Sequence, residues 1–154
     1  MLIALAVLCA AGARAAASDH DAHHESDAIG RPGIAARVTR TVKIRMNDSM
    51  RFTPATIHVR QNKTVRFAIT NAGQLKHEWM LGTPDELKEH AELMKKFPEM
   101  EHDDPDQISL APGAHGDVVW KFTRAGKVDF ACLQPGHYDA GMKGVVNVAR
   151  AGKK

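Results

Sequence analysis

The sequence contains few cysteines, no long apolar segment and no strong excess of charge. Its formal net charge is only +3. No cluster of Lys and Arg is interleaved with aromatic residues, so nothing supports nucleic-acid binding. The apolar run from Leu2 to Ala11 has ten residues, whereas a helix needs about 20 to cross a bilayer. We therefore expect no nucleic-acid partner and no stable membrane insertion of the mature chain.

Residues 1–17 are expected to form a secretory signal peptide. The apolar run is followed by Ala13-Arg14-Ala15 and Ala15-Ala16-Ala17, both of which are small-x-small cleavage patterns. Cleavage is expected near Ala15 or Ala17, and the mature chain is expected in the periplasm. What remains has the size of one domain with a real core.

Export leaves Cys132 as the only thiol, because Cys9 departs with the signal peptide. A lone cysteine in an oxidising compartment is an intermolecular disulfide, an idle buried thiol or a protected metal ligand. The surrounding sequence favours the ligand, since His137 and Met142 follow at steps of five residues, with Gly136 just before the His. Thiolate, imidazole and thioether suit a copper ion that cycles between Cu(I) and Cu(II).

Such a site needs a second imidazole from elsewhere, and His77 is the candidate. Taken singly, His77 would more simply be a core histidine and Met142 a core methionine, because Met often fills cores. Together with Cys132 and His137, those simpler interpretations require four coincidences at the right spacing. We therefore predict a copper site formed by the four residues.

The rest of the chain divides into a polar arm and a strand-rich domain. Residues 18–36 hold three histidines, several acids and almost nothing large and apolar, which predicts a flexible His-rich arm. From residue 37 to 150, alternation predicts short strands, separated by turns such as Ala111-Pro112-Gly113. The expected strands lie at 38–46, 57–59, 65–69, 108–110, 118–122, 128–131 and 145–148, and residues 79–81 are expected to continue the core after His77. This pattern indicates an all-β Greek-key sandwich.

One helical insertion interrupts the strands. Thr83 is the expected N-cap, Pro84 the first helical residue, and Glu86 completes a capping box. Leu87, Ala91 and Met94 form a single apolar stripe, and the helix is expected to end at Phe97-Pro98.

The segment Cys132-Leu-Gln-Pro-Gly-His137-Tyr-Asp-Ala-Gly-Met142 resembles the C-terminal ligand loop of the cupredoxins, the blue-copper family. The resemblance covers about residues 38–148, and His77 matches the upstream His of the family. It implies a cupredoxin sandwich with one type 1 copper held by His77, Cys132, His137 and Met142, a set that suits such a site. It also implies that His137 is the more solvent-accessible imidazole. Among cupredoxins, the segment from Lys76 to Leu81, the helix and the arm look most like the periplasmic proteins of bacterial copper tolerance.

One position departs from the family pattern. The residue after the upstream His commonly carries Asn or another group that hydrogen bonds near the sulfur, but here it is Glu78. An acid beside the ligands is expected to alter the potential, and it leaves a blue and a green site as alternatives.

Additional soft ligands suggest weaker copper sites. After cleavage at Ala17 the terminus would be Ser18-Asp19-His20, which can wrap Cu(II) in a square-planar set of nitrogens; the simpler alternative is a solvated arm. A second Cu(I) site is a hypothesis beside the more ordinary packing role of methionine. The candidate accessory residues are His20, His23, His24, Met46, Met50, His90, Met94, Met100 and His102.

The leading functional hypothesis is a periplasmic type 1 copper protein of copper tolerance or homeostasis. Its expected partner is a redox protein or a copper-handling protein of the periplasm. The alternative is a dedicated soluble electron-transfer cupredoxin that serves a respiratory or oxidase partner. An enzyme is not expected, because multicopper oxidases and copper nitrite reductases combine several domains with paired His motifs, and this chain has one domain and no His-x-His pair.

Overall fold

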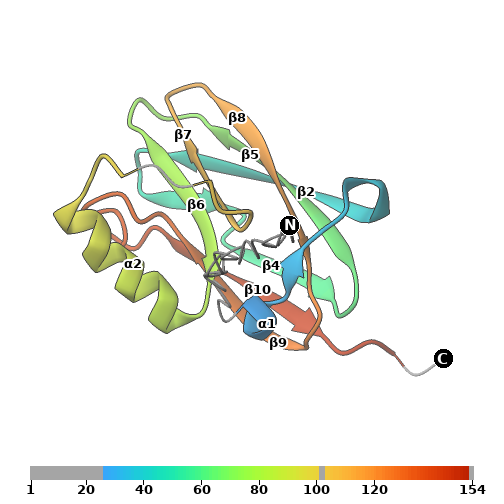
Figure 1. Ribbon diagram of the computed structural model, residues 1–154. Helices are drawn as coiled ribbons and strands as arrows, with labels where there is room; N and C mark the ends of the chain where they lie inside the picture. The colour runs from blue at the N-terminus through green and yellow to red at the C-terminus, as the bar shows by residue number, and fades with distance from the viewer. Residues whose placement is uncertain (1–25, 101–102, 153–154) are drawn as a thin grey trace, which may run out of the picture.

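Two five-stranded sheets face each other across an apolar core in the computed structural model, which describes residues 26–100 and 103–152 (Figure 1). The first sheet has the strand order β1-β8-β5-β2-β3 and the second the order β4-β10-β9-β6-β7. The elements in chain order are α1 (Ser26–Ile29), β1 (Arg31–Pro32), the 3-10 turn η1 (Ala35–Arg37), β2 (Val38–Asn47), β3 (Arg51–Thr53), β4 (Thr56–Arg60), β5 (Thr64–Asn71), β6 (His77–Gly82), α2 (Pro84–Lys96), β7 (Gln107–Leu110), β8 (His115–Lys121), β9 (Gly126–Ala131) and β10 (Lys143–Ala149).

The connections between the sheets confirm the predicted all-β sandwich. The strands β2 and β5 pair in parallel, as do β4 and β10, while the other pairs are antiparallel. Parallel neighbours cannot be joined by a tight hairpin, so the chain crosses between sheets as a Greek-key sandwich requires.

Alternation along the strands produces the core. In β2, Val42, Ile44 and Met46 are buried while the residues between them are exposed, because successive side chains of a strand point to opposite faces. The core centre is aromatic: the rings of Phe67 and Trp79 lie 4.8 Å apart between centroids. Trp79 and Trp120 are both fully buried, which confirms their expected role as core residues.

The helix α2 forms as its capping sequence predicts. The Glu86 N–H donates to Thr83 Oγ1 (3.3 Å) and the Thr83 N–H donates to Glu86 Oε2 (2.7 Å). Its buried stripe, Leu87, Ala91 and Met94, packs against Ala131 and Leu133 at the end of β9. The helix therefore covers the strand end that leads into the predicted ligand loop.

The N-terminal part of the domain begins earlier than the sequence suggests. Ile29 is only 5% exposed, and its carbonyl accepts the indole N–H of Trp120 at 3.0 Å. Arg31 and Pro32 pair with β8 at the sheet edge. Placing residues 26–36 in the flexible arm is therefore wrong, because one buried apolar residue and a few backbone pairs hold this polar segment on the sandwich. The signal-peptide and arm residues 1–25 lie outside the described residues.

Candidate copper site

The four predicted ligands meet at one end of the second sheet. His77 is the first residue of β6, Cys132 directly follows β9, and Met142 directly precedes β10. The strands β6 and β10 both pair with β9 in antiparallel register, and Lys143 lies opposite Ala131. This register brings the start of β6, the end of β9 and the start of β10 together, with Met142 next to Cys132.

Three ligand atoms converge on one point. His77 Nδ1 lies 3.9 Å from Cys132 Sγ, and His137 Nδ1 lies 3.3 Å from the same sulfur. All three atoms lie within 4.8 Å of one another, and the two imidazole centroids are 4.9 Å apart. A metal with bonds of about 2.3 Å to sulfur and about 2.0 Å to nitrogen would separate these donors by roughly 3.8 Å in a trigonal plane. The two sulfur–nitrogen distances, 3.3 and 3.9 Å, lie close to this spacing, so small shifts of the side chains would bring the three donors onto one metal ion.

The loop that carries three of the ligands is closed by its own backbone. The Cys132 N–H donates to the Met142 carbonyl, and the Met142 N–H donates to the His137 carbonyl, each at 3.0 Å. Gly136 and Gly141 precede His137 and Met142 with φ of +84° and +91°, a region that glycine enters without steric cost. Met142 is fully buried and shares the core cluster with Cys132, so both sulfur residues lie on the inner side of the loop.

The Cys132 thiol is held in an apolar environment. The residue is fully buried and forms no disulfide, and burial raises the pKa of the thiol to about 12. The Glu78 N–H donates to Sγ at 3.3 Å. Without metal the group is thus a thiol at neutral pH, and a cation that binds there must displace its proton.

The two imidazoles differ in their exposure. His77 is fully buried, whereas His137 is only partly buried, which confirms that His137 is the more accessible ring. Burial, followed by the neighbouring His77, lowers the pKa of His137. A neutral imidazole is the form that binds a metal.

Matches to known proteins agree with this geometry. The family model of copper binding proteins, plastocyanin/azurin family, matches residues 38–149. The chain belongs to this cupredoxin family. Together with the convergent His and Cys side chains, membership establishes copper as the cofactor, with one type 1 site.

Three relatives extend the similarity beyond the family level. The cupredoxin is 50% identical to the copper-resistant cuproprotein CopI of Rubrivivax gelatinosus over 96% of this chain and 94% of the relative. It is 34% identical to CopI of Pseudomonas aeruginosa over 96% and 93% of the two chains. It is 32% identical to CopI of Vibrio cholerae over 74% and 68%. It is therefore a CopI-like cupredoxin, as the motifs of its sequence suggest.

Solved structures support the same fold. The reduced auracyanin of Roseiflexus castenholzii superposes with a TM-score of 0.64 at 21% identity, over 73% of this chain and 98% of that one. Auracyanin A, a blue copper protein from Chloroflexus aurantiacus, gives a TM-score of 0.59 at 22% identity, over 70% and 97%. At this identity the likeness establishes the cupredoxin sandwich alone.

Two acidic residues beside the ligands shape the site further. Glu78 is 1% exposed, and burial raises the pKa of its carboxyl to about 7. Asp48, which no sequence pattern singles out, has its Oδ1 3.1 Å from His77 Nε2. A hydrogen bond from the Gln74 N–H, with His77 contributing, lowers the pKa of Asp48. No spacing rule joins residues that stand 29 positions apart, so only the fold reveals this contact.

The candidate accessory methionines, all of which the structure describes, fall in two separate apolar clusters. Met46 and Met94 are buried among apolar neighbours, and Met50 and Met100 pack partly buried against the two apolar clusters. Among described residues, the only group of three or more His, Cys, Asp or Glu close enough to hold an ion is the His77, Cys132 and His137 group. His20, His23, His24 and His102 lie outside the described residues.

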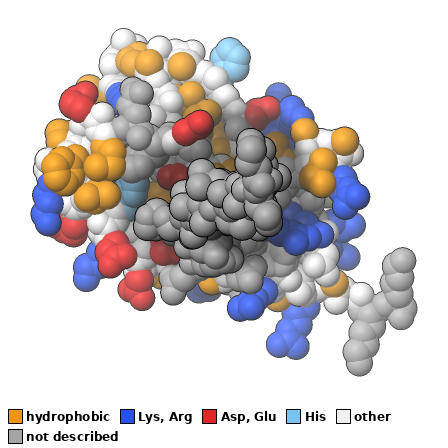
Figure 2. All heavy atoms as spheres, in the orientation of Figure 1, with side chains coloured by type: hydrophobic (Ala, Val, Ile, Leu, Met, Phe, Trp, Pro, Cys, Tyr) orange, Lys and Arg blue, Asp and Glu red, His pale blue; other side chains and the backbone are white. Residues whose placement is uncertain are grey.

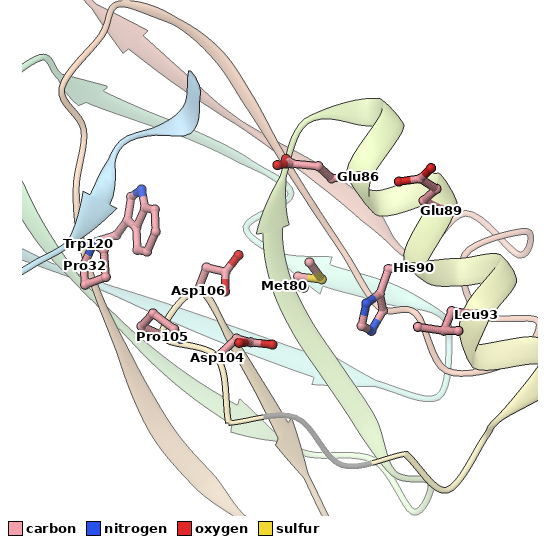
Figure 3. A pocket seen from close by; sticks show the side chains of 10 residues that line it. All are labelled: Pro32, Met80, Glu86, Glu89, His90, Leu93, Asp104, Pro105, Asp106 and Trp120. Carbon is pink, nitrogen blue, oxygen red and sulfur yellow. The ribbon is translucent and has the colours of Figure 1, made fainter. Parts of the chain in front are cut away.

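His90 lines a separate pocket of about 630 Å³ between α2, β6 and the loop before β7 (Figure 3). Met80 from β6 and Asp104 and Asp106 from the loop line it as well. Leu93 lies at this pocket and Phe97 one helical turn further, and both are exposed.

Figure 2 shows acidic and apolar side chains on the side of α2, with Lys and Arg more frequent on the opposite side. In the described part of the chain, no helix is long and apolar enough to cross a membrane.

Proposed function

We propose that this cupredoxin protects the bacterial periplasm from copper by holding a redox-active type 1 copper ion through His77, Cys132, His137 and Met142. The observation that carries the proposal is the convergence of two imidazole Nδ1 atoms and one buried thiol within 4.8 Å. The buried thioether of Met142 on the same loop completes a set of two imidazoles, one thiolate and a weak axial thioether.

The protein's own residues prepare the site for one-electron chemistry, which bound copper supplies. Cys132 releases its proton on metal binding, so loading is favoured as pH rises. The Glu78 N–H remains aimed at the sulfur (3.3 Å) and stabilises its negative charge. The closed loop and the buried His77 hold the donors in place, which limits rearrangement between oxidation states. His137, the partly exposed ring, is the route by which an electron would enter or leave.

Copper tolerance is supported by the relatives rather than by the site alone. Three CopI proteins, named as copper-resistant, share 32–50% identity with this chain. The N-terminal apolar run with its small-residue cleavage patterns supports export to the periplasm. There the partner would be a redox or copper-handling protein. The proposal assigns copper binding and electron exchange, not an enzymatic reaction.

A dedicated electron-transfer role is the second candidate, and the accessible His137 favours it. A strain that lacks the protein should regain copper tolerance when the wild type is returned, and should not when Cys132→Ala is returned. Deletion of residues 18–25 tests the His-rich arm. If the deletion lowers copper tolerance but leaves the electron-transfer rate unchanged, copper handling is supported. If neither the deletion nor Cys132→Ala changes copper tolerance, the tolerance role is refuted.

Spectroscopy tests the ligand set directly. Copper-loaded wild type should show a strong thiolate-to-copper charge-transfer band and a type 1 paramagnetic-resonance signal, and Cys132→Ala should lose both. Met142→Leu should raise the potential, because the weak axial donor is removed. The matched control is Met94→Leu, which changes an equally buried methionine and should leave the potential unchanged. An unaltered potential in Met142→Leu would remove Met142 from the ligand set.

A further inference from the structure

The turn between β2 and β3 carries a carboxylate to the edge of the copper site. Asp48 Oδ2 accepts the Gln74 N–H at 2.7 Å, and Oδ1 accepts the Leu75 N–H at 3.3 Å. Oδ1 also lies 3.1 Å from His77 Nε2. The Asp48 side chain therefore contacts the segment before His77 and the His77 ring at the same time.

Gly73 makes this close approach sterically feasible. A Cβ at position 73 would lie 2.0 Å from Asp48 Oδ1, closer than two non-bonded atoms can come. Only glycine lets the 73–75 backbone approach the carboxylate closely enough for both amides to donate to it. Three contacts thus hold the Asp48 carboxylate, although the side chain is 36% exposed.

The contact determines which nitrogen of His77 is available to a metal. An ionised carboxylate offers only acceptors, so Nε2 must carry the proton that it shares with Asp48. The other nitrogen, Nδ1, is then a free acceptor, and it is the atom that faces Cys132 Sγ at 3.9 Å. The His77 ring is fully buried, and among the described residues its Nε2 contacts the Asp48 carboxylate.

We propose that Asp48 is a positioning residue of the copper site, which fixes the tautomer and orientation of His77 and lowers the reduction potential. A carboxylate that accepts the distal proton of a ligating imidazole increases the basicity of the ligand. A more basic ligand stabilises Cu(II) more than Cu(I). The same hydrogen bond also opposes rotation of the ring away from the metal in the reduced state.

The proposal rests on the proposed copper site, and its test separates the two. Asp48→Asn keeps the size of the side chain but removes its charge. Mutation of the hydrogen-bond partner of a metal ligand typically costs 10–100-fold in metal affinity. With Asp48 partly exposed, we expect the ratio of Cu(II) to Cu(I) affinity to fall about tenfold, which equals a rise of about 59 mV in the potential.

The matched control is Asp139→Asn, which also removes one negative charge, but from the loop that carries His137 and Met142. Asp139 is 66% exposed and lies 3.5 Å from Lys95 Nζ, with no contact to His77. The potential should rise clearly more in Asp48→Asn than in Asp139→Asn, while both keep the charge-transfer band. Equal shifts in the two variants would overturn the role of Asp48. A wild type without the charge-transfer band would instead refute the copper site itself.

A measurement on the wild type covers the case in which Asp48→Asn fails to fold. Nitrogen-15 NMR of the Cu(I)-loaded protein should show a slowly exchanging proton on His77 Nε2. A fast-exchanging Nε2 proton, or a proton on Nδ1, would contradict the proposed hydrogen bond.

Discussion

The buried carboxyl of Glu78 should make the copper-free protein less stable at alkaline than at acidic pH. Glu78 is 1% exposed, its Oε2 has no hydrogen-bond partner among the described residues, and burial raises its pKa from 4.5 to about 7. The folded protein therefore binds this proton more tightly than the unfolded chain does. The resulting stability is fully present below about pH 4.5, declines between 4.5 and 7, and is absent above 7.

The size of the effect follows from the two pKa values. One pKa unit corresponds to about 1.4 kcal/mol, so a pKa raised from 4.5 to about 7 represents roughly 3 kcal/mol of unfolding free energy. Glu78→Gln resembles the protonated acid at every pH. It should therefore remove this slope and stabilise the copper-free protein at pH 8 by roughly 3 kcal/mol relative to wild type.

Urea unfolding of copper-free protein at several pH values between 4.5 and 8 measures the effect. Other titrating groups, including His137, contribute equally to both proteins and cancel in the difference between variant and wild type. Glu89→Gln, on the exposed face of α2, is the matched control and should leave the profile unchanged. Parallel plots of unfolding free energy against pH for Glu78→Gln and the wild type, from pH 4.5 to 8, would contradict the raised pKa of the Glu78 carboxyl.

Three further outcomes are expected. Met94→Ala should lower the free energy of unfolding in urea by about 2–5 kcal/mol, because the residue is 1% exposed. The copper stoichiometry should stay the same, and a drop in stoichiometry would support Met94 as an accessory ligand. Thr83→Ala should destabilise the protein by about 1 kcal/mol through loss of the helix cap, visible in thermal circular dichroism; an unchanged midpoint would contradict the capping role. Removing copper should lower the melting temperature, since a ligand at a hundredfold excess over its Kd adds about 2.7 kcal/mol; calorimetry of Cys132→Ala, with and without copper, should show no such difference.

The copper ligands were predictable because most of their geometry is local. Cys132, His137 and Met142 lie on one loop, and its backbone hydrogen bonds follow from short spacing and from glycines at the turns. The helix α2 was equally predictable, because its capping box and its apolar stripe are formed by residues that are close in sequence. The long strands followed from alternation, which a half-buried sheet imposes on every second residue.

Features that depend on contacts between distant residues were not predictable. The packing of Ile29 against Trp120 joins positions 91 residues apart, and the polar sequence around Ile29 suggests a free arm. The strand β3 has three residues, too few for alternation to be recognised. Asp48 meets His77 only because β2 and β5 lie side by side and place the turn after β2 next to the loop after β5.

The turn at residues 48–50 supports both ligand-bearing segments at once. Asp48 contacts His77, and Arg51, directly after the turn, donates through Nη1 to the Ala140 carbonyl of the ligand loop at 3.0 Å. Exposed turns are usually where a protein accepts inserted residues, provided that their backbone and side chains are not engaged. This turn is exposed but engaged on both sides, so the chain has little freedom to change its length there. The turn at residues 124–125, at the far end of β9 from Cys132, carries no such link and is the better place to attach a label or a second domain.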